Sequence, residues 1–240
     1  MNKPTLFTVF TPRLLDLYDL KDNVVVIIDV FRATSTIAAA LHNGAKKVYA
    51  VETVEECIKK GEKLNALTAG ERDGKIIEGL QHGNSPLEYA PEIVKDKILV
   101  LTTTNGTKML NMAVQQNAEA VITGSFPNIE SVCDFLLSQN KNVILACAGW
   151  KDGFNLEDTL FAGALIYRIK NNFTIHCDSS VAAENIYRQH RDDLSGFVRQ
   201  TTHWHRLQAY GLEKDLKYCI TENIANVLPI YDKAEGALII

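Results

Sequence analysis

Short apolar segments alternate with longer amphipathic segments between residues 6 and 147, and this alternation constrains the fold more than any other feature of the sequence. The apolar segments have the length of strands and are rich in branched side chains. Continuous apolar strands joined by helices are typical of a mainly parallel sheet covered on both faces. The sequence therefore predicts an α/β fold, a three-layer α/β/α architecture with a mixed, mainly parallel sheet. The predicted strands are residues 6–10, 24–29, 47–51, 98–102, 120–123 and 143–147.

Helix boundaries support this interpretation. Gly44 follows a run of strong helix formers, as a C′ glycine does, and Thr53 with Glu56 has the spacing of a capping box. The last third is less regular, with helices predicted at 156–170 and 182–190 and strands at 227–231 and 237–240. We expect these two strands to return to the edge of the sheet. Because the 240 residues contain no linker or repeat, we predict one domain over residues 1–240.

Composition excludes several function classes. Hydrophobic residues make up 46% and charged residues 22% of the chain, as in soluble globular proteins, and the formal net charge is −4. Nucleic acids and anionic membranes attract strongly basic proteins, so neither is an expected partner. Any anionic ligand then requires local positive charge. No segment resembles a signal peptide or approaches the roughly 20 apolar residues of a membrane span, so we expect a cytoplasmic location. A homo-oligomer stays open.

Cysteine and histidine spacing does not favour a disulfide framework or a zinc site. The five cysteines are scattered, odd in number and without a C-x-x-C pair, so they are predicted to be buried thiols. His203 and His205 flank Trp204, but no third cysteine or histidine lies nearby. Walker A, G-x-G-x-x-G, H-E-x-x-H and G-x-S-x-G motifs are also absent. Haloacid-dehalogenase phosphatases carry a second aspartate two residues after the first, where this chain has Phe31.

The segment DVFRATST, residues 29–36, places charged and hydroxyl side chains directly after an apolar strand. Ligands of open α/β sheets usually bind beyond the carboxyl ends of the strands, where helix N-termini present free N–H groups. Asp29 at the strand end and Arg32 in the loop are therefore predicted to lie at an anion site. The hydroxyls predicted to contact a phosphate are those of Thr34, Ser35 and Thr36. The alternative is ordinary N-capping, for which one hydroxyl is sufficient.

The segment LVLTTTNGTKML repeats this design at a second strand end. Thr103, Thr104, Asn105 and Gly106 offer hydroxyls, an amide and an open backbone before a predicted helix. The alternative is a tight turn, for which Asn-Gly is the usual signal.

Carboxylates recur in two further segments. Glu71 and Arg72 have no structural explanation beyond a surface ion pair, whereas Ser85 and Glu88 fit a capping box with proline at the first helical position.

Glu157 and Asp158 would follow the strand at 143–147 on the same carboxyl edge. Asn155 and Asp158 also fit reciprocal capping of the next helix. Hard cations such as Mg²⁺ favour one or two carboxylates with water and substrate oxygens, so a Mg²⁺ site is the competing interpretation.

Taken together, DVFRATSTIAAALHNGA, AGERDG, GNSPLEY, LTTTNGT, CAGWKDGFNLEDTLFAGA and HWHRLQAYGLEKDLKYC resemble the 2-phosphosulfolactate phosphatase family, in the same order and over most of the chain. The resemblance implies a Mg²⁺-dependent hydrolase that converts 2-phospho-3-sulfolactate to 3-sulfolactate and phosphate, a step associated with coenzyme M synthesis. It implies a small anionic phosphorylated substrate. The matching positions are Asp29, Arg32, Thr34, Thr36, Gly70, Glu71, Arg72, Asn84, Ser85, Pro86, Thr103, Asn105, Gly106, Thr107, Glu157, Asp158, His203 and Arg206.

From these positions, together with Ser35 and Thr104 of the two strand-end segments, we predict three roles. The predicted catalytic residues are Asp29, Glu71, Asp158 and His203, and the predicted Mg²⁺ ligands are Asp29, Glu157 and Asp158. The predicted substrate-binding residues are Arg32, Thr34, Ser35, Thr36, Arg72, Asn84, Ser85, Thr103, Thr104, Asn105, Gly106, Thr107 and Arg206. The nucleophile stays open between Asp29 and a metal-bound water.

Two other functions compete with this prediction. One is a phosphatase for another small phosphorylated hydroxy acid, and the other is a non-catalytic binder of such an anion. A pure anion-binding site has no use for clustered carboxylates, because each repels the ligand unless a cation intervenes. The carboxylates therefore favour a metal-dependent enzyme.

Overall fold

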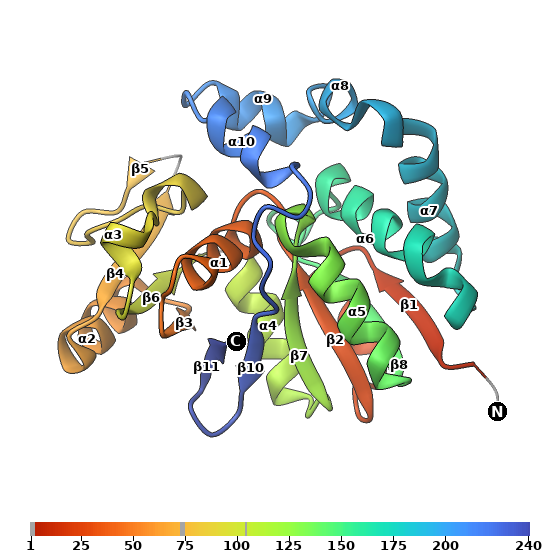
Figure 1. The fold of residues 1–240 in the computed structure, drawn as a ribbon, viewed down its shortest axis with the longest axis horizontal. Coiled ribbons are helices and arrows are strands. Elements are labelled where there is room, and N and C mark those ends of the chain that lie inside the picture. The colour runs from red at the N-terminus through yellow and green to blue at the C-terminus, as the bar shows by residue number, and fades with distance from the viewer. Residues whose placement is uncertain (1–2, 73–74, 104) are drawn as a thin grey trace.

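The computed structural model describes residues 3–72, 75–103 and 105–240, which form one mixed sheet with helices on both faces (Figure 1). Eleven described strands pair in the order β5-β4-β6-β3-β11-β10-β7-β2-β8-β1-β9. Their bounds are β1 Thr5–Val9, β2 Asn23–Ile28, β3 Lys47–Val51, β4 Leu67–Arg72, β5 Lys75–Ile76, β6 Ile98–Thr102, β7 Ala120–Gly124, β8 Asn142–Cys147, β9 Thr174–Ile175, β10 Ile230–Asp232 and β11 Ala237–Ile239. The three-layer α/β/α prediction is confirmed. The single-domain assignment stays a prediction.

The helices connect these strands much as the sequence predicts. Gly44 has the positive φ of a C′ residue (97°), and the Thr53 hydroxyl accepts the Glu56 N–H at 3.1 Å. The α-helices are α1 Ala33–His42, α2 Val54–Leu64, α3 Pro91–Val94, α4 Gly106–Gln115, α5 Ile129–Gln139, α6 Leu156–Ile169, α7 Asp178–His190, α8 Leu194–Val198, α9 Thr202–Gln208 and α10 Glu213–Cys219. The 3-10 helices are η1 Pro12–Leu17, η2 Pro86–Glu88, η3 Phe126–Asn128, η4 Lys170–Asn172 and η5 Arg191–Asp193.

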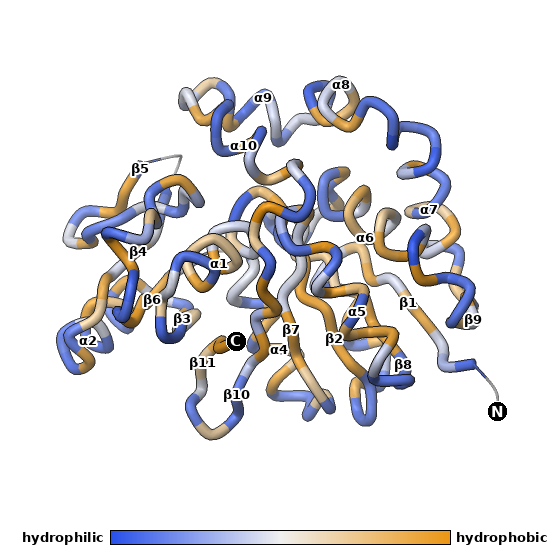
Figure 2. Tube along the Cα trace, in the orientation of Figure 1, coloured by the Kyte–Doolittle hydropathy of each residue, from blue (hydrophilic) through white to orange (hydrophobic). Residues whose placement is uncertain are grey.

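Strand β2 shows why a continuous apolar run becomes a central strand. Successive side chains of a strand point to opposite faces of the sheet. Val24, Val26 and Ile28 pack in a cluster with α5 and α6, whereas Val25 and Ile27 pack in another with α1 and α4. Both faces are covered, so every residue after Asn23 is apolar, and Figure 2 shows this hydrophobic centre.

The C-terminal hairpin corrects one prediction. Strands β10 and β11 do not lie at the edge of the sheet but in its middle, antiparallel to β7 and β3 (Figure 1). The parallel strands form two groups, β4-β6-β3 and β7-β2-β8-β1-β9, and the hairpin joins them. The apolar pattern identified the two strands, but it contains no information about which strands they pair with.

Helices α8, α9 and α10 lie beyond the carboxyl ends of the central strands, at the top of Figure 1. All five cysteines have free thiols, four of them buried, and Cys177 is partly exposed. Among the described residues, no helix is long and apolar enough to cross a bilayer.

Candidate active site

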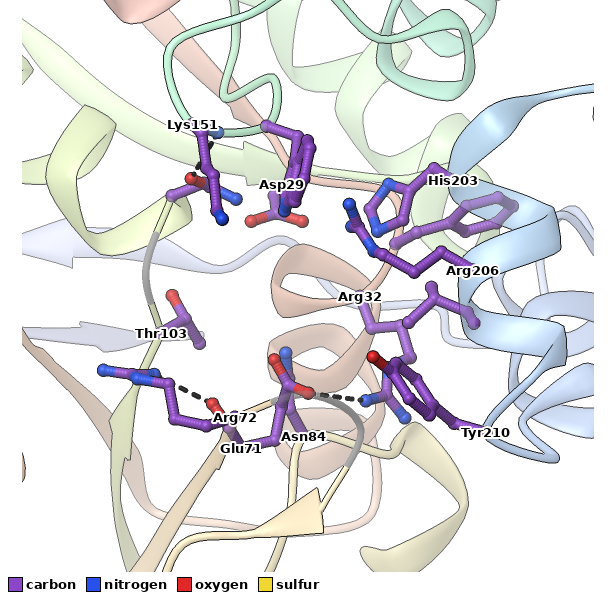
Figure 3. A pocket seen from close by; sticks show the side chains of 14 residues that line it. Asp29, Arg32, Glu71, Arg72, Asn84, Thr103, Lys151, His203, Arg206 and Tyr210 are labelled. Carbon is purple, nitrogen blue, oxygen red and sulfur yellow. Dashed lines mark hydrogen bonds and ion pairs between the residues drawn. The ribbon is translucent and has the colours of Figure 1, made fainter.

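A pocket of about 320 Å³ lies at the predicted carboxyl edge of the sheet (Figure 3). Its walls come from the segments that follow β2, β6 and β8, from the end of β4, from Asn84 before η2, and from α9 with the residues just after it. The lining residues are Asp29, Phe31, Arg32, Glu71, Arg72, Asn84, Thr103, Asn105, Trp150, Lys151, His203, Arg206, Leu207 and Tyr210. The fold thus brings together nine of the predicted site residues.

Asp29 lies directly after β2 and is only 8% exposed. Burial raises the pKa of its carboxyl to about 6, and the charge of nearby Glu157 adds to this rise. The charge of His203 and the hydrogen bonds that the Ala33 and Gly106 N–H groups donate to the carboxylate lower the pKa in part. Gly106 begins α4 so close to this carboxylate that an added Cβ would lie 2.9 Å from Asp29 Oδ2. A side chain at position 106 would therefore force the Asp29 carboxylate to shift.

His203 and Glu157 form a buried pair beside Asp29. His203 Nδ1 hydrogen-bonds to Glu157 Oε1, and the edge of the imidazole meets Phe31 with ring centroids 5.9 Å apart. Glu157 is completely buried, and its Oε2 has no hydrogen-bond partner among the described residues. Because Nδ1 is engaged by Glu157, Nε2 is the nitrogen of His203 left to act in the pocket. A carboxylate that orients a histidine is a common arrangement for proton transfer.

Asp158 lies behind the pocket and is also completely buried. Its Oδ1 accepts the Val30 N–H at 2.8 Å, and its Oδ2 accepts the Gly149 N–H at 3.1 Å and the Asn155 amide at 2.9 Å. Burial raises its pKa well above the usual value. Asp158 thus connects the loop after β2 to the loop after β8 through hydrogen bonds. Its pairing with Asn155 agrees with the alternative interpretation, capping of α6.

The three hydroxyls at the start of α1 also face inward. Thr34 donates to the Asp29 carbonyl at 2.9 Å, Ser35 to the Val30 carbonyl at 3.0 Å, and Thr36 to the Asn84 carbonyl at 3.1 Å. All three are buried and none lines the pocket. This geometry gives their predicted substrate contacts no support. They fix the loop that carries Asp29 and Arg32.

The second strand end contributes less directly than predicted. Thr103 and Asn105 line the pocket, while Gly106 and Thr107 lie behind it. The Thr103 hydroxyl lies 3.1 Å from the Thr107 hydroxyl and accepts the Thr107 N–H, in the first turn of α4, at 3.3 Å. Thr104 lies outside the described residues.

On the opposite wall, the positive charge of Arg32 is paired with two carboxylates. Arg32 is 4% exposed, with Nη1 2.5 Å from Asp215 Oδ2 on α10 and Nη2 3.7 Å from Glu71 Oε2. Arg72 donates to the Glu71 carbonyl at 2.8 Å. Asp215 was missed by the sequence analysis, because nothing local connects residue 215 with residue 32.

Two neighbouring positions complete this wall. Asn84 lines the pocket, is 6% exposed, and its Oδ1 has no hydrogen-bond partner among the described residues. Ser85 accepts the Leu87 N–H at 3.2 Å and lies outside the pocket lining, as expected of a cap. Asn84 is therefore the pocket-facing residue of the pair.

Trp150, Lys151 and Tyr210 line the pocket but were not predicted from the sequence. Trp150 and Lys151 lie in the loop after β8, so their place after a strand end was the available signal. Arg206 also lines the pocket, and its guanidinium lies 3.8 Å from the centre of the Trp150 ring.

Among the described residues, the acidic side chains that line the pocket are those of Asp29 and Glu71. The described residues contain no group of three or more His, Cys, Asp or Glu side chains placed to hold a metal ion. Mg²⁺ often takes only one or two carboxylates, with water and substrate phosphate oxygens as its other ligands, so Asp29 fits such a site. Glu157 and Asp158 are buried behind the pocket, which leaves Asp29 as the predicted ligand that the geometry favours.

The sequence model of a family described as 2-phosphosulpholactate phosphatase matches residues 9–234. Three relatives are each named "Probable 2-phosphosulfolactate phosphatase". The protein from Caldanaerobacter subterraneus subsp. tengcongensis is 39% identical over 88% of this chain and 88% of its own length. The protein from Thermotoga petrophila is 41% identical over 85% of this chain and 87% of its own length. The protein from Synechocystis sp. is 38% identical over 93% of this chain and 95% of its own length. The chain therefore belongs to the 2-phosphosulfolactate phosphatase family.

Proposed function

We propose that this chain hydrolyses 2-phospho-3-sulfolactate to 3-sulfolactate and phosphate. The observation that supports this most is the pocket itself, in which a buried carboxylate, a carboxylate-oriented histidine and several cationic side chains converge. Family membership supports the same reaction. Coenzyme M synthesis, a cytoplasmic location and the oligomeric state stay predictions.

We place the phosphate group at the Asp29 and His203 side of the pocket. Asp29 would hold Mg²⁺, which when bound neutralises phosphate charge and acts as a Lewis acid. In the reaction, water adds to phosphorus and keeps one proton as the hydroxyl of the product phosphate, while the bond between phosphorus and the C2 oxygen breaks. A proton passes from His203 Nε2 to that oxygen, and the second proton of the water restores the one that His203 Nε2 gave up. Glu157 keeps the imidazole oriented through Nδ1.

Direct attack by Asp29, with an acyl phosphate as intermediate, is the alternative to attack by water. Quenching the reaction during turnover and treating the protein with borohydride separates the two. Reduction of the Asp29 side chain shows that it carried an acyl phosphate, whereas an unreduced Asp29 supports attack by water.

The activity test uses purified protein with Mg²⁺ and four substrates: phosphosulfolactate, phospholactate, 2-phosphoglycerate and p-nitrophenyl phosphate. We expect phosphate release to be fastest from phosphosulfolactate and to stop with EDTA. Equal turnover of phospholactate would instead favour the other-phosphatase alternative. Activity that EDTA does not reduce would remove Mg²⁺ from the proposal.

A further inference from the structure

The loop from Gly149 to Gly153 holds its backbone in a tightly specified shape. Trp150 and Gly153 exchange both of their backbone hydrogen bonds, at 3.0 and 2.9 Å. Lys151 and Asp152 both have positive φ, 49° and 62°. Residues other than glycine rarely adopt a backbone conformation with positive φ, so contacts with surrounding residues must maintain it.

Those contacts are present. The Lys151 N–H donates to Asn105 Oδ1 at 3.2 Å, and Asp152 pairs with Lys108 at 2.6 Å and with Arg13 at 3.7 Å. The loop is thus fixed on its outer side, and its Trp150 and Lys151 side chains line the pocket. Figure 3 shows Lys151 there.

Two cations share the Trp150 indole. The Arg206 guanidinium carbon lies 3.8 Å and the Lys151 Nζ 4.7 Å from the ring centre, within the range of cation–π attraction. Among the described residues, Lys151 Nζ has no carboxylate within ion-pair distance, whereas Arg32 meets both Asp215 and Glu71. The positive charge of Lys151, which no described carboxylate neutralises, therefore faces the pocket on this side.

We propose that Lys151, together with Arg206 on the Trp150 ring, binds the sulfonate of the substrate and determines specificity for it. A sulfonate spreads one charge over three oxygens, so it can accept from an ammonium and a guanidinium at once. Guanidinium is weakly hydrated and suits such an anion, particularly when held on an aromatic face. This inference rests on the proposed function, since it assigns one group of that substrate.

Kinetics of Lys151→Gln test the assignment. We expect kcat/KM for phosphosulfolactate to fall about 10- to 100-fold, mostly through KM, as for loss of one charge-assisted bond. Because phospholactate has no sulfonate, its kcat/KM should fall far less, so the preference between the two substrates should drop by a similar factor. Lys151→Arg should restore much of that preference. Lys59→Gln is the matched control, because Lys59 is an exposed lysine on α2 outside the pocket. This variant should keep the wild-type preference for phosphosulfolactate over phospholactate.

Three outcomes would overturn the assignment. Equal losses on both substrates would place Lys151 at the phosphate or the carboxylate, which both substrates carry, and no loss on either would remove it from the site. A third substrate is 2-sulfoethyl phosphate, which has the sulfonate but lacks the carboxylate. If Lys151→Gln hydrolysed it as well as the wild type does, Lys151 would be assigned to the carboxylate. If the wild-type protein itself does not hydrolyse phosphosulfolactate, the proposed function fails, which is a separate result.

Binding of the product gives a second readout. The chain has two tryptophans, Trp150 at 41% exposure and Trp204 buried at 2%, so an anion displacing solvent at Trp150 should change its fluorescence. We expect 3-sulfolactate to produce this change, Lys151→Gln to weaken its Kd about 10- to 100-fold, and Trp150→Phe to abolish the signal. An identical Kd in wild type and Lys151→Gln would contradict the proposal.

Discussion

At the scale of single residues, Asp29 combines a functional position with a cost in stability. Its folded pKa of about 6 exceeds the usual value of 3.8, so the folded state binds more protons than the unfolded state between these pH values. Stability therefore falls as pH rises through this window, and the loss is complete above pH 6. The difference of about two units corresponds to roughly 3 kcal/mol.

Asp29→Asn should therefore raise stability while it removes activity. In EDTA at pH 7.5, we expect a higher free energy of unfolding in urea, by up to about 3 kcal/mol, because a buried charge is lost. At pH 3.5 the gain should disappear. Turnover with Mg²⁺ should fall roughly 10³-fold or more. A variant destabilised at pH 7.5 would show that the Asp29 charge stabilises the fold.

His203 is predicted to protonate the leaving oxygen, and this role depends on the leaving group. His203→Gln should lower kcat for phosphosulfolactate roughly 10²- to 10⁴-fold. The loss should be much smaller for p-nitrophenyl phosphate, because p-nitrophenolate leaves without protonation. Glu157→Gln should show the same contrast in weaker form, since it acts through His203. Equal losses on both substrates would assign His203 to binding or to activation of water.

At the scale of secondary-structure elements, the sequence predicts what local patterns determine. Strand β2 was predictable from its apolar run, and α2 from Thr53 and Glu56. The inward hydroxyls of Thr34 and Ser35 were not, because a hydroxyl at a helix start can serve a ligand or the backbone equally well. Contacts between distant segments, such as Arg32 with Asp215, leave no local signal. The site was therefore predictable as a sheet edge carrying Asp29, but not as a complete set of side chains.

The central hairpin makes a prediction at this scale. Leu238 on β11 is completely buried against the core, whereas Ile240 just beyond it is 67% exposed. Leu238→Ala should lower the free energy of unfolding by about 2–5 kcal/mol, because it leaves a cavity where the two parallel groups meet. Ile240→Ala, the matched control, should change it by less than about 0.5 kcal/mol. Urea unfolding measures both, and equal effects would contradict a hairpin in the middle of the sheet.

At the scale of the whole molecule, the active site is a product of the complete fold. Its walls come from residues 29 to 210, carried by segments after three strands, by the end of β4 and by α9 with the residues just after it. The unfolded chain holds none of these groups together. A ligand that needs several of them binds the folded state alone, and its binding energy then adds to stability.

Mg²⁺ should reveal this linkage without any turnover. An ion that binds only the folded protein stabilises it by about 2.7 kcal/mol at a concentration of 100 times Kd, and for a chain of this size each kcal/mol raises Tm by roughly 2–4 °C. We therefore expect Tm to rise with Mg²⁺ concentration in the wild type and to rise little in Asp29→Asn. Asp152→Asn is the matched control, because Asp152 pairs with Lys108 and Arg13 and does not line the pocket. Its Mg²⁺ response should equal that of the wild type, and a response of Asp29→Asn as large as the wild type's would exclude Asp29 as the main ligand.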